Sequence, residues 1–440
     1  MYLLNKLHLQ KIVLLFTVLL LTACGGGAST KATTPSTADL QNLAANAVAQ
    51  AVVVAPTGLN SNQIVSAGLS ATAGQPIDAG LPPIADVFIG TIDLPYYFDT
   101  SNSTTSFWLP SLDVRETLNV PVLMTLPNNS PAPATGWPIV MFQHGITQDR
   151  TNLLAIAHAF AAVGFAAVAI DLPTHGLIDA ANPLHADNPS NPFPNDVEQT
   201  FGQNATSGQN FINLASLLTS RDNFRQGAAN LITLRASLGG IINAAAGGPV
   251  LIDTNRVAFV GHSLGGMVGV SYLGAETTPT PSSILNAGAT ITDVLQNSQS
   301  FSPVIEAGLA NLGVTTPAGI AGFYANAQEL IDAGEPANFA AAAAATHPIH
   351  LVEVLGDATV PNSSTENLAD IMGAFTISNS TTDIAPGNPG IVRFVDGDHS
   401  SPLSPAASLP ATIEIQSQVA TFLATGGTTI LVDPTNTLVE

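Results

Sequence analysis

A buried stretch followed by a glycine-flanked serine constrains the fold more than any other part of the sequence. Residues 257–266 read V-A-F-V-G-H-S-L-G-G. The four apolar residues at its start predict a short buried strand bounded by turn signals. A serine on a sharp strand-to-helix turn needs small residues two positions before and after it, and Gly261 and Gly265 meet that need. The stretch therefore predicts a strand, a strained turn at Ser263 and a helix that begins directly afterwards.

Apolar runs elsewhere predict further strands that alternate with helices. Strands are predicted at 87–92, 118–126, 138–142, 165–170, 283–287, 349–355 and 391–395, and helices at 152–163, 211–238 and 413–423. This alternation predicts a mostly parallel central sheet flanked by helices. Residues 289–346 are Ala-rich and helix-forming, with no strand signal. They predict a helical cap or lid inserted late in the sheet.

The start of the chain predicts targeting rather than fold. Lys6 and Lys11 accompany a largely apolar run that is far shorter than the ~20 residues of a spanning helix. The run ends in Leu-Thr-Ala-Cys, and Cys24 is the only cysteine of the chain. This resembles the lipobox of bacterial lipoproteins, in which the cysteine is lipidated and becomes the mature N-terminus. By the same resemblance, Gly25 after the cysteine suggests the outer membrane or cell surface of a Gram-negative bacterium.

Three segments follow from these patterns. Residues 1–23 are the predicted signal peptide. Residues 24–60 are rich in Gly, Ser, Thr, Ala and Pro, and predict a flexible tether. Residues 61–440 are the predicted folded domain, with the cap at 289–346. The chain would thus be attached to a membrane only through lipid at Cys24.

Composition excludes one class of partner. The chain carries 10 Lys and Arg against 31 Asp and Glu, for a net charge of −21. With so few basic residues the chain cannot form a basic surface for nucleic acid. Its acidic surface also disfavours binding to anionic polymers. A neutral ester remains compatible with this charge. A hydrophobic share of 46% is ample for a large core.

The order of candidate residues along the chain matches a serine hydrolase. The α/β-hydrolase fold places its nucleophile, acid and histidine in this chain order, each after a strand. Asp357 follows the predicted strand at 349–355, whereas Glu353 lies within it. His399 is the only histidine after Asp357. We therefore predict a triad of Ser263, Asp357 and His399, and interpret His347 and His350 as structural.

An oxyanion needs backbone donors as well. The N–H of Leu264, directly after the serine, is the first predicted donor. The second is the N–H of Ile146, in the loop after the strand at 138–142. In the same stretches, we interpret His144 as an anchor of its loop and His262 as a packing residue.

Further motifs carry a more specific resemblance. They are Gly90 with Leu-Pro-Tyr-Tyr at 94–97, Gln-His-Gly-Ile at 143–146, Asp-Leu-Pro at 171–173 with His-Gly at 175–176, Arg-Asp-Asn-Phe-Arg-Gln at 221–226, and the serine turn. With these the chain resembles bacterial extracellular lipases of the Pla-1/cef type, which include surface lysophospholipase lipoproteins. The resemblance implies lipolytic ester hydrolysis. For 221–226 two interpretations stay open, an anchor beneath the loops near the site and a solvated helix face.

Three functions are compatible with the sequence. The first is a serine carboxylic ester hydrolase, lipase- or lysophospholipase-like, that cleaves acyl lipids through an acyl-enzyme without a cofactor. The second is an esterase for short soluble or polymeric esters. The third is a non-catalytic surface binding lipoprotein on a hydrolase scaffold. The run Asp396-Gly397-Asp398 lacks a full calcium-loop pattern, so no metal site is predicted. The sequence predicts no oligomeric state.

Overall fold

The computed structural model describes residues 37–69, 83–99, 105–109, 111–197, 206–435 and 437–440. The predicted signal peptide and Cys24 lie outside the described residues. Within them, no helix is both long enough and apolar enough to cross a membrane.

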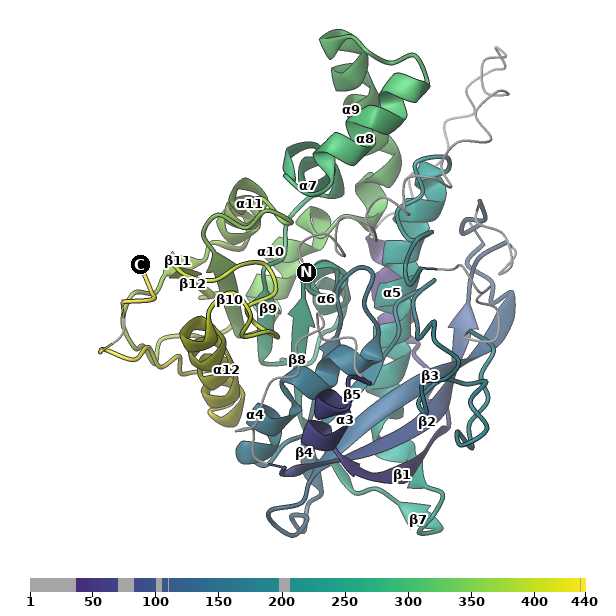
Figure 1. Cartoon of the computed structure of the whole chain (residues 1–440), viewed down its shortest axis with the longest axis vertical. Coiled ribbons are helices and arrows are strands. Elements are labelled where there is room, and N and C mark those ends of the chain that lie inside the picture. Colours follow the sequence, from purple (N-terminus) through teal and green to yellow (C-terminus); the bar gives the residue numbers. More distant parts are fainter. Residues whose placement is uncertain (1–36, 70–82, 100–104, 110, 198–205, 436) are drawn as a thin grey trace.

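A twelve-stranded sheet forms the centre of the molecule (Figure 1). In chain order its strands are β1 (Val52–Asn60), β2 (Ala85–Tyr96), β3 (Glu116–Pro127), β4 (Trp137–Gln143), β5 (Ala166–Ile170), β6 (Ile241–Asn243), β7 (Gly248–Pro249), β8 (Ile252–His262), β9 (Ser282–Leu285), β10 (Ile349–Val354), β11 (Phe375–Thr376) and β12 (Gly390–Phe394). Across the sheet they follow the order β11-β12-β10-β9-β8-β4-β5-β3-β2-β1-β6-β7.

The strands that precede the predicted site residues lie in a parallel run. Neighbouring strands from β12 through β10, β9, β8 and β4 to β5 all pair in parallel. β4, β5, β9 and β10 are buried along their whole length, as expected for parallel strands covered on both faces. Antiparallel pairs continue the sheet from β5 through β3 and β2 to β1. The predicted mostly parallel sheet is confirmed.

Helices cover both faces of this sheet. They are α2 (Ala38–Ala45), α3 (Ser61–Ser66), α4 (Ala157–Ala162), α5 (Leu217–Ser237), α6 (Leu264–Ala275), α7 (Ile291–Asn297), α8 (Ser302–Asn311), α9 (Pro317–Ile331), α10 (Ala337–Thr346), α11 (Asn362–Met372) and α12 (Leu409–Ala424), with 3-10 turns η1 (Arg150–Ala155), η3 (Leu238–Gly240) and η4 (Asp332–Gly334). α2, α5, α6, α10 and α11 share one apolar core, and α3, α4 and α12 share a second. Successive residues of a strand point to opposite faces, so Val140 and Met141 of β4 belong to different cores.

Part of the predicted flexible tether, 24–60, is folded. α2 and β1 both lie inside it, and β1 pairs with β2. Val52 and Val54 are fully buried, because alternate residues of β1 face the core. Asp39 of α2 forms an ion pair of 2.6 Å with the buried guanidinium of Arg225. The tether prediction is therefore wrong for residues 38–60, where apolar alternation and one ion pair attach the chain to the domain.

The polar cluster at 221–226 is buried within α5. Arg225 pairs with Asp222 at 2.9 Å, and its guanidinium carbon lies 4.3 Å from the ring centroid of Trp108. Asp222 also accepts a hydrogen bond of 2.8 Å from the backbone N–H of Trp108. Burial lowers the pKa of Arg225, and the neighbouring Asp222 opposes that shift. The solvated-face interpretation is wrong, since these side chains hold neighbouring segments onto α5.

The predicted cap, 289–346, contains four helices, and they differ in how they pack. α7, α8 and α9 project beyond the sheet, at the top of Figure 1. α10 instead lies against α6, where a Cβ added to Gly274 would come 2.6 Å from the Cβ of Phe339. This close approach needs a glycine. The insertion therefore has a protruding part and a part that belongs to the core of the domain.

Candidate active site

Ser263 occupies a strained turn between β8 and α6. Its backbone angles are φ 55° and ψ −125°, a conformation that costs on the order of 1–3 kcal/mol for a non-glycine residue. A Cβ on Gly261 would lie 2.6 Å from the carbonyl oxygen of Gly265, and one on Gly265 would overlap the carbonyl oxygen of Gln143. The backbone N–H of Ser263 donates to Leu285 at 2.8 Å, which ties the turn to β9. The sequence prediction of a strained serine turn is confirmed.

The helix that follows the serine presents free donors. α6 begins at Leu264, and Ser263 accepts the hydrogen bond of Met267 at 3.1 Å. The first N–H groups of a helix have no partner within it, and they lie at the positive end of the helix dipole. The N–H of Leu264 is one of these groups, so it has no partner within the helix and lies at the serine turn.

The loop after β4 passes directly beside the serine. A Cβ added to Gly145 would lie 3.1 Å from the Cβ of Ser263. A side chain at this position would be a tight contact and would push the loop or the serine apart by a few tenths of an ångström. Ile146, the predicted second donor, follows Gly145 and is partly buried. The structure thus brings together the two segments that carry the predicted oxyanion donors.

Two buried histidines hold this loop in shape. His144 donates from Nδ1 to the carbonyl of Gly145 at 2.8 Å and accepts at Nε2 from the N–H of Leu172 at 3.0 Å. His175 donates to Pro173 at 2.9 Å and accepts from Thr147 at 3.3 Å. Both rings are fully buried.

Each histidine donates once and accepts once, which is the pattern of a neutral imidazole. Burial keeps both rings in that form: it lowers the pKa of His144 well below its ordinary range and that of His175 to about 4. The interpretation of His144 as a loop anchor is confirmed. His175 belongs to a sequence motif for which no role was predicted, and the structure shows that it is a second anchor of the loop.

Asp357 and His399 meet at the ends of two adjacent parallel strands, β10 and β12. His399 Nδ1 lies 2.6 Å from Asp357 Oδ2. The other carboxylate oxygen of Asp357 accepts the N–H groups of Thr359 at 2.7 Å and Val360 at 3.0 Å. The Asp357 side chain is 2% exposed and that of His399 is 16% exposed. The carboxylate therefore has partners on both oxygens, whereas the imidazole keeps access to the surface.

The loop of His399 is also bound to the serine turn. The rings of His262 and His399 have their centroids 5.0 Å apart. His262 Nε2 lies 2.8 Å from the backbone carbonyl oxygen of His399, and Asn286 Nδ2 donates to the same oxygen at 3.0 Å. His262 is thus more than the packing residue that its position predicts. Sequence reasoning missed Asn286 altogether, because an asparagine after a strand is an ordinary turn residue.

The remaining candidate side chains have structural partners. His347 accepts from Thr280 at 3.0 Å and donates to Leu273 at 2.8 Å, and His350 is fully buried beside Ser283, so both are structural as predicted. In the 396–398 run, the carboxylate of Asp398 accepts from Ser400 at 2.8 Å within a turn. Across the described ranges, no three His, Cys, Asp or Glu side chains gather as they would around a metal ion.

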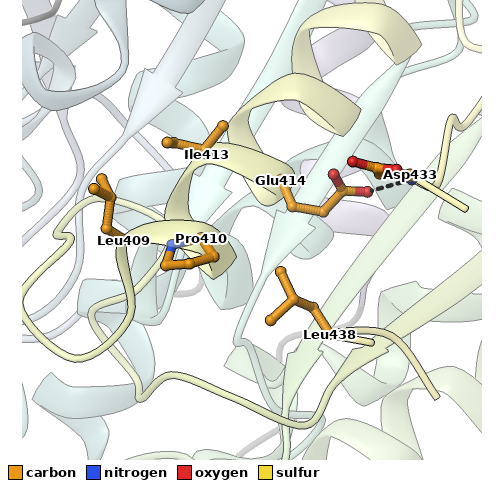
Figure 2. Close-up of a pocket in the computed structure, with 6 residues that line it drawn as sticks. All are labelled: Leu409, Pro410, Ile413, Glu414, Asp433 and Leu438. Carbon is orange, nitrogen blue, oxygen red and sulfur yellow. Dashed lines mark hydrogen bonds between the residues drawn. The ribbon is translucent and has the colours of Figure 1, made fainter. Parts of the chain in front are cut away.

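A surface hollow of about 280 Å³ lies elsewhere, between the start of α12 and the C-terminal segment (Figure 2). Leu409, Pro410, Ile413, Glu414, Asp433 and Leu438 line it. None of the predicted site residues is among them. The candidate site is therefore the place where β8, β10 and β12 end, and not this hollow.

The strand order, the strained serine turn after β8 and the acid and histidine after β10 and β12 define the α/β-hydrolase fold. No protein-family model matches the chain, and no curated protein sequence matches it.

Solved structures resemble the chain at low identity. Acetyl xylan esterase 1 from Thermoanaerobacterium sp. JW/SL YS485 is 13% identical, over 88% of this chain and 95% of that chain, with a TM-score of 0.46. Acetyl xylan esterase from Paenibacillus sp. R4 is 13% identical, over 82% and 87%, with a TM-score of 0.44. A thermostable esterase from Pseudomonas putida ECU1011 is 16% identical, over 92% and 97%, with a TM-score of 0.39.

Proposed function

We propose that this chain is a serine carboxylic ester hydrolase, with Ser263 as nucleophile, His399 as general base and Asp357 as the acid that orients it. Two observations together carry the proposal: the strained backbone of Ser263 at the start of α6, and a histidine, His399, whose Nδ1 lies 2.6 Å from the Asp357 carboxylate. The ring of His399 packs 5.0 Å from that of His262, the residue directly before the serine. Backbone strain of this kind is found most often at functional sites. The proposal extends to Leu264 and Ile146 as oxyanion donors.

The proposed reaction follows from this arrangement. Ser263 Oγ attacks the acyl carbonyl while His399 Nε2 takes its proton, and Asp357 stabilises the imidazolium that forms. The N–H groups of Leu264 and Ile146 donate to the oxyanion of the tetrahedral intermediate. The alcohol leaves with the proton from His399, and an acyl-enzyme remains on Ser263. Water then attacks the acyl group in the same way, and releases the acid.

For the substrate we propose an acyl ester of lipid character. Two features support this choice. The protruding part of the cap carries exposed apolar side chains, among them Leu330 on α9 at 43% and Leu312, directly after α8, at 51%. The lipobox at Cys24 would hold the enzyme at the cell envelope, close to lipid. The resemblance to lipase lipoproteins agrees with both features.

Labelling by a fluorophosphonate probe tests the reaction. We expect the wild-type chain to be labelled and Ser263→Ala to lose labelling and ester hydrolysis. Ser271→Ala is a matched control, since Ser271 is a buried serine on the same helix, α6. It should be labelled like the wild type. A wild-type chain that the probe does not label would leave the non-catalytic binding lipoprotein as the better interpretation.

A series of p-nitrophenyl esters from acetate to palmitate tests the substrate. Long-chain esters should give the higher kcat/KM. Preference for acetate or butyrate would refute the lipid substrate and favour an esterase for short or polymeric esters. The anchor is tested separately: Cys24→Ala should move the chain from the detergent phase to the aqueous phase on phase partitioning. An unchanged distribution would refute lipidation.

A further inference from the structure

The backbone carbonyl of His399 is held by two side-chain donors. His262 Nε2 lies 2.8 Å from its oxygen, and Asn286 Nδ2 lies 3.0 Å from it. A carbonyl oxygen can accept two hydrogen bonds, so both of its acceptor positions are used. A loop carbonyl that is bound in this way cannot turn without losing two partners.

The two donors belong to rigid parts of the fold. His262 is the last residue of β8, and Asn286 directly follows β9. Asn286 is itself fixed, because its N–H donates to Val352 of β10 at 2.9 Å. Three neighbouring parallel strands therefore determine where the carbonyl of His399 lies. The histidine itself is on the loop after β12.

The protonation state of His262 suits the role of a donor. Burial, reinforced by the nearby His399, lowers the pKa of His262 to about 3, so the ring is neutral at physiological pH. A carbonyl oxygen can only accept, so the single ring proton must be on Nε2. Nδ1 then carries the lone pair, and within the described chain this buried atom has no hydrogen-bond partner. The tautomer is thus decided by the bond to His399.

Asn286 shows a second sign of function. Its φ is 49°, in the left-handed region, and it is 1% exposed. Its Oδ1 is buried without a partner among the described residues, whereas its Nδ2 donates to His399. A buried polar atom without a partner costs about 1–3 kcal/mol. Asparagine adopts the left-handed region more readily than other non-glycine residues, so the turn suits it. The unpaired Oδ1 shows that the side chain is oriented for its donor, Nδ2, rather than for its acceptor.

We infer that His262 and Asn286 are positioning residues for His399: together they hold its backbone carbonyl so that its imidazole is presented to Ser263. The inference rests on the proposed function. Asp357 holds the ring at Nδ1, and the two donors hold the backbone, which leaves Nε2 for the serine. Loss of a donor should lower kcat and leave KM nearly unchanged, because neither residue is proposed to bind substrate.

The central experiment compares two substitutions of His262. His262→Phe keeps a ring against His399 and removes the donor, and His262→Gln restores an N–H on a side chain of similar reach. Displacement of a catalytic group by about 1 Å can cost about 10²-fold in rate, so we expect kcat of the Phe variant to fall about 10–100-fold. KM should stay within about twofold, and the Gln variant should recover most of the lost activity.

Two further variants separate positioning from stability. Asn286→Gly removes the second donor and tolerates the positive φ, and we expect kcat to fall about tenfold. His347→Phe is the matched control. It removes another buried histidine whose Nε2 donates to a backbone carbonyl at 2.8 Å, that of Leu273, in a part of the fold that does not hold His399. It should lower the melting temperature and leave kcat at the wild-type value.

A signal independent of substrate completes the test. The short Asp357–His399 hydrogen bond should give a downfield proton resonance in the wild type, and His262→Phe should weaken or broaden it. Wild-type kcat in both His262→Phe and Asn286→Gly, or no recovery by His262→Gln, would overturn the inference. If His262→Phe does not fold, the kcat of Asn286→Gly alone tests the inference. A fall of about tenfold supports it, and a wild-type value overturns it. Failure of the proposed function is a different result, namely a wild-type chain that the fluorophosphonate does not label.

Discussion

Glu335 at the base of the cap should make the stability of the protein fall as pH rises. The residue is 1% exposed and lies between η4 and α10. Its Oε1 accepts the N–H of Ile291 at 2.8 Å, and its Oε2 accepts from Gln328 at 2.8 Å. Burial raises the pKa of Glu335 to about 7 from an ordinary 4.5, against the lowering effect of these hydrogen bonds, and Asp332 adds a smaller increase.

The sign follows from proton binding. Below about pH 4.5 the carboxyl is protonated in the folded and the unfolded chain, and its contribution to stability is fully present. Between 4.5 and about 7 only the folded chain keeps the proton, so the free energy of unfolding decreases with rising pH. At about 1.4 kcal/mol for each pH unit, the decrease amounts to about 3 kcal/mol. Above about 7 the loss is complete.

Glu335→Gln removes the titrating carboxyl, and with it the part of the pH dependence of the free energy of unfolding that Glu335 causes. We expect the stability of the wild type relative to the Gln variant to fall by about 3 kcal/mol from pH ~4 to pH ~8. Urea unfolding followed by circular dichroism at several pH values measures this difference. Glu329→Gln on α9 is the control, since it removes the same charge from an exposed position. A difference that is constant with pH, or that rises with pH, would refute the reasoning.

Four more substitutions test the site and its support. Asp357→Asn should lower kcat by about 10³–10⁴-fold, because the amide no longer selects the imidazole tautomer, and wild-type turnover would contradict the proposed triad. Gly265→Ala should lower the melting temperature sharply, since its Cβ would overlap the carbonyl of Gln143; an unchanged melting curve would show that the turn is looser than the structure describes. Arg225→Met should cost about 1–3 kcal/mol in chemical unfolding, because Asp222, which is fully buried, loses one of its two cationic partners and keeps Arg221. Asp39→Asn should cost less, since the Asp39 side chain is 23% exposed.

The sequence by itself determined the class of fold and the chain order of the candidate site. Buried parallel strands consist of continuous apolar runs, and the demand for glycine on both sides of Ser263 comes from the backbone at that turn. Both are local signals, so they can be read without the rest of the chain. The positions of Asp357 and His399 are local signals too, because each follows a strand of the parallel run.

Only the tertiary structure decided which distant segments support the site. In the folded part of the predicted tether, α2 is joined to the domain by an ion pair with Arg225, more than a hundred residues away in the chain, and no local pattern reveals that Asp39 will reach it. The two donors to the carbonyl of His399 come from different strands, and their convergence depends on the register between β8 and β9. Local residue patterns predict strands and turns. Contacts between side chains far apart in sequence depend on how those elements pack against each other, and no local pattern contains that information.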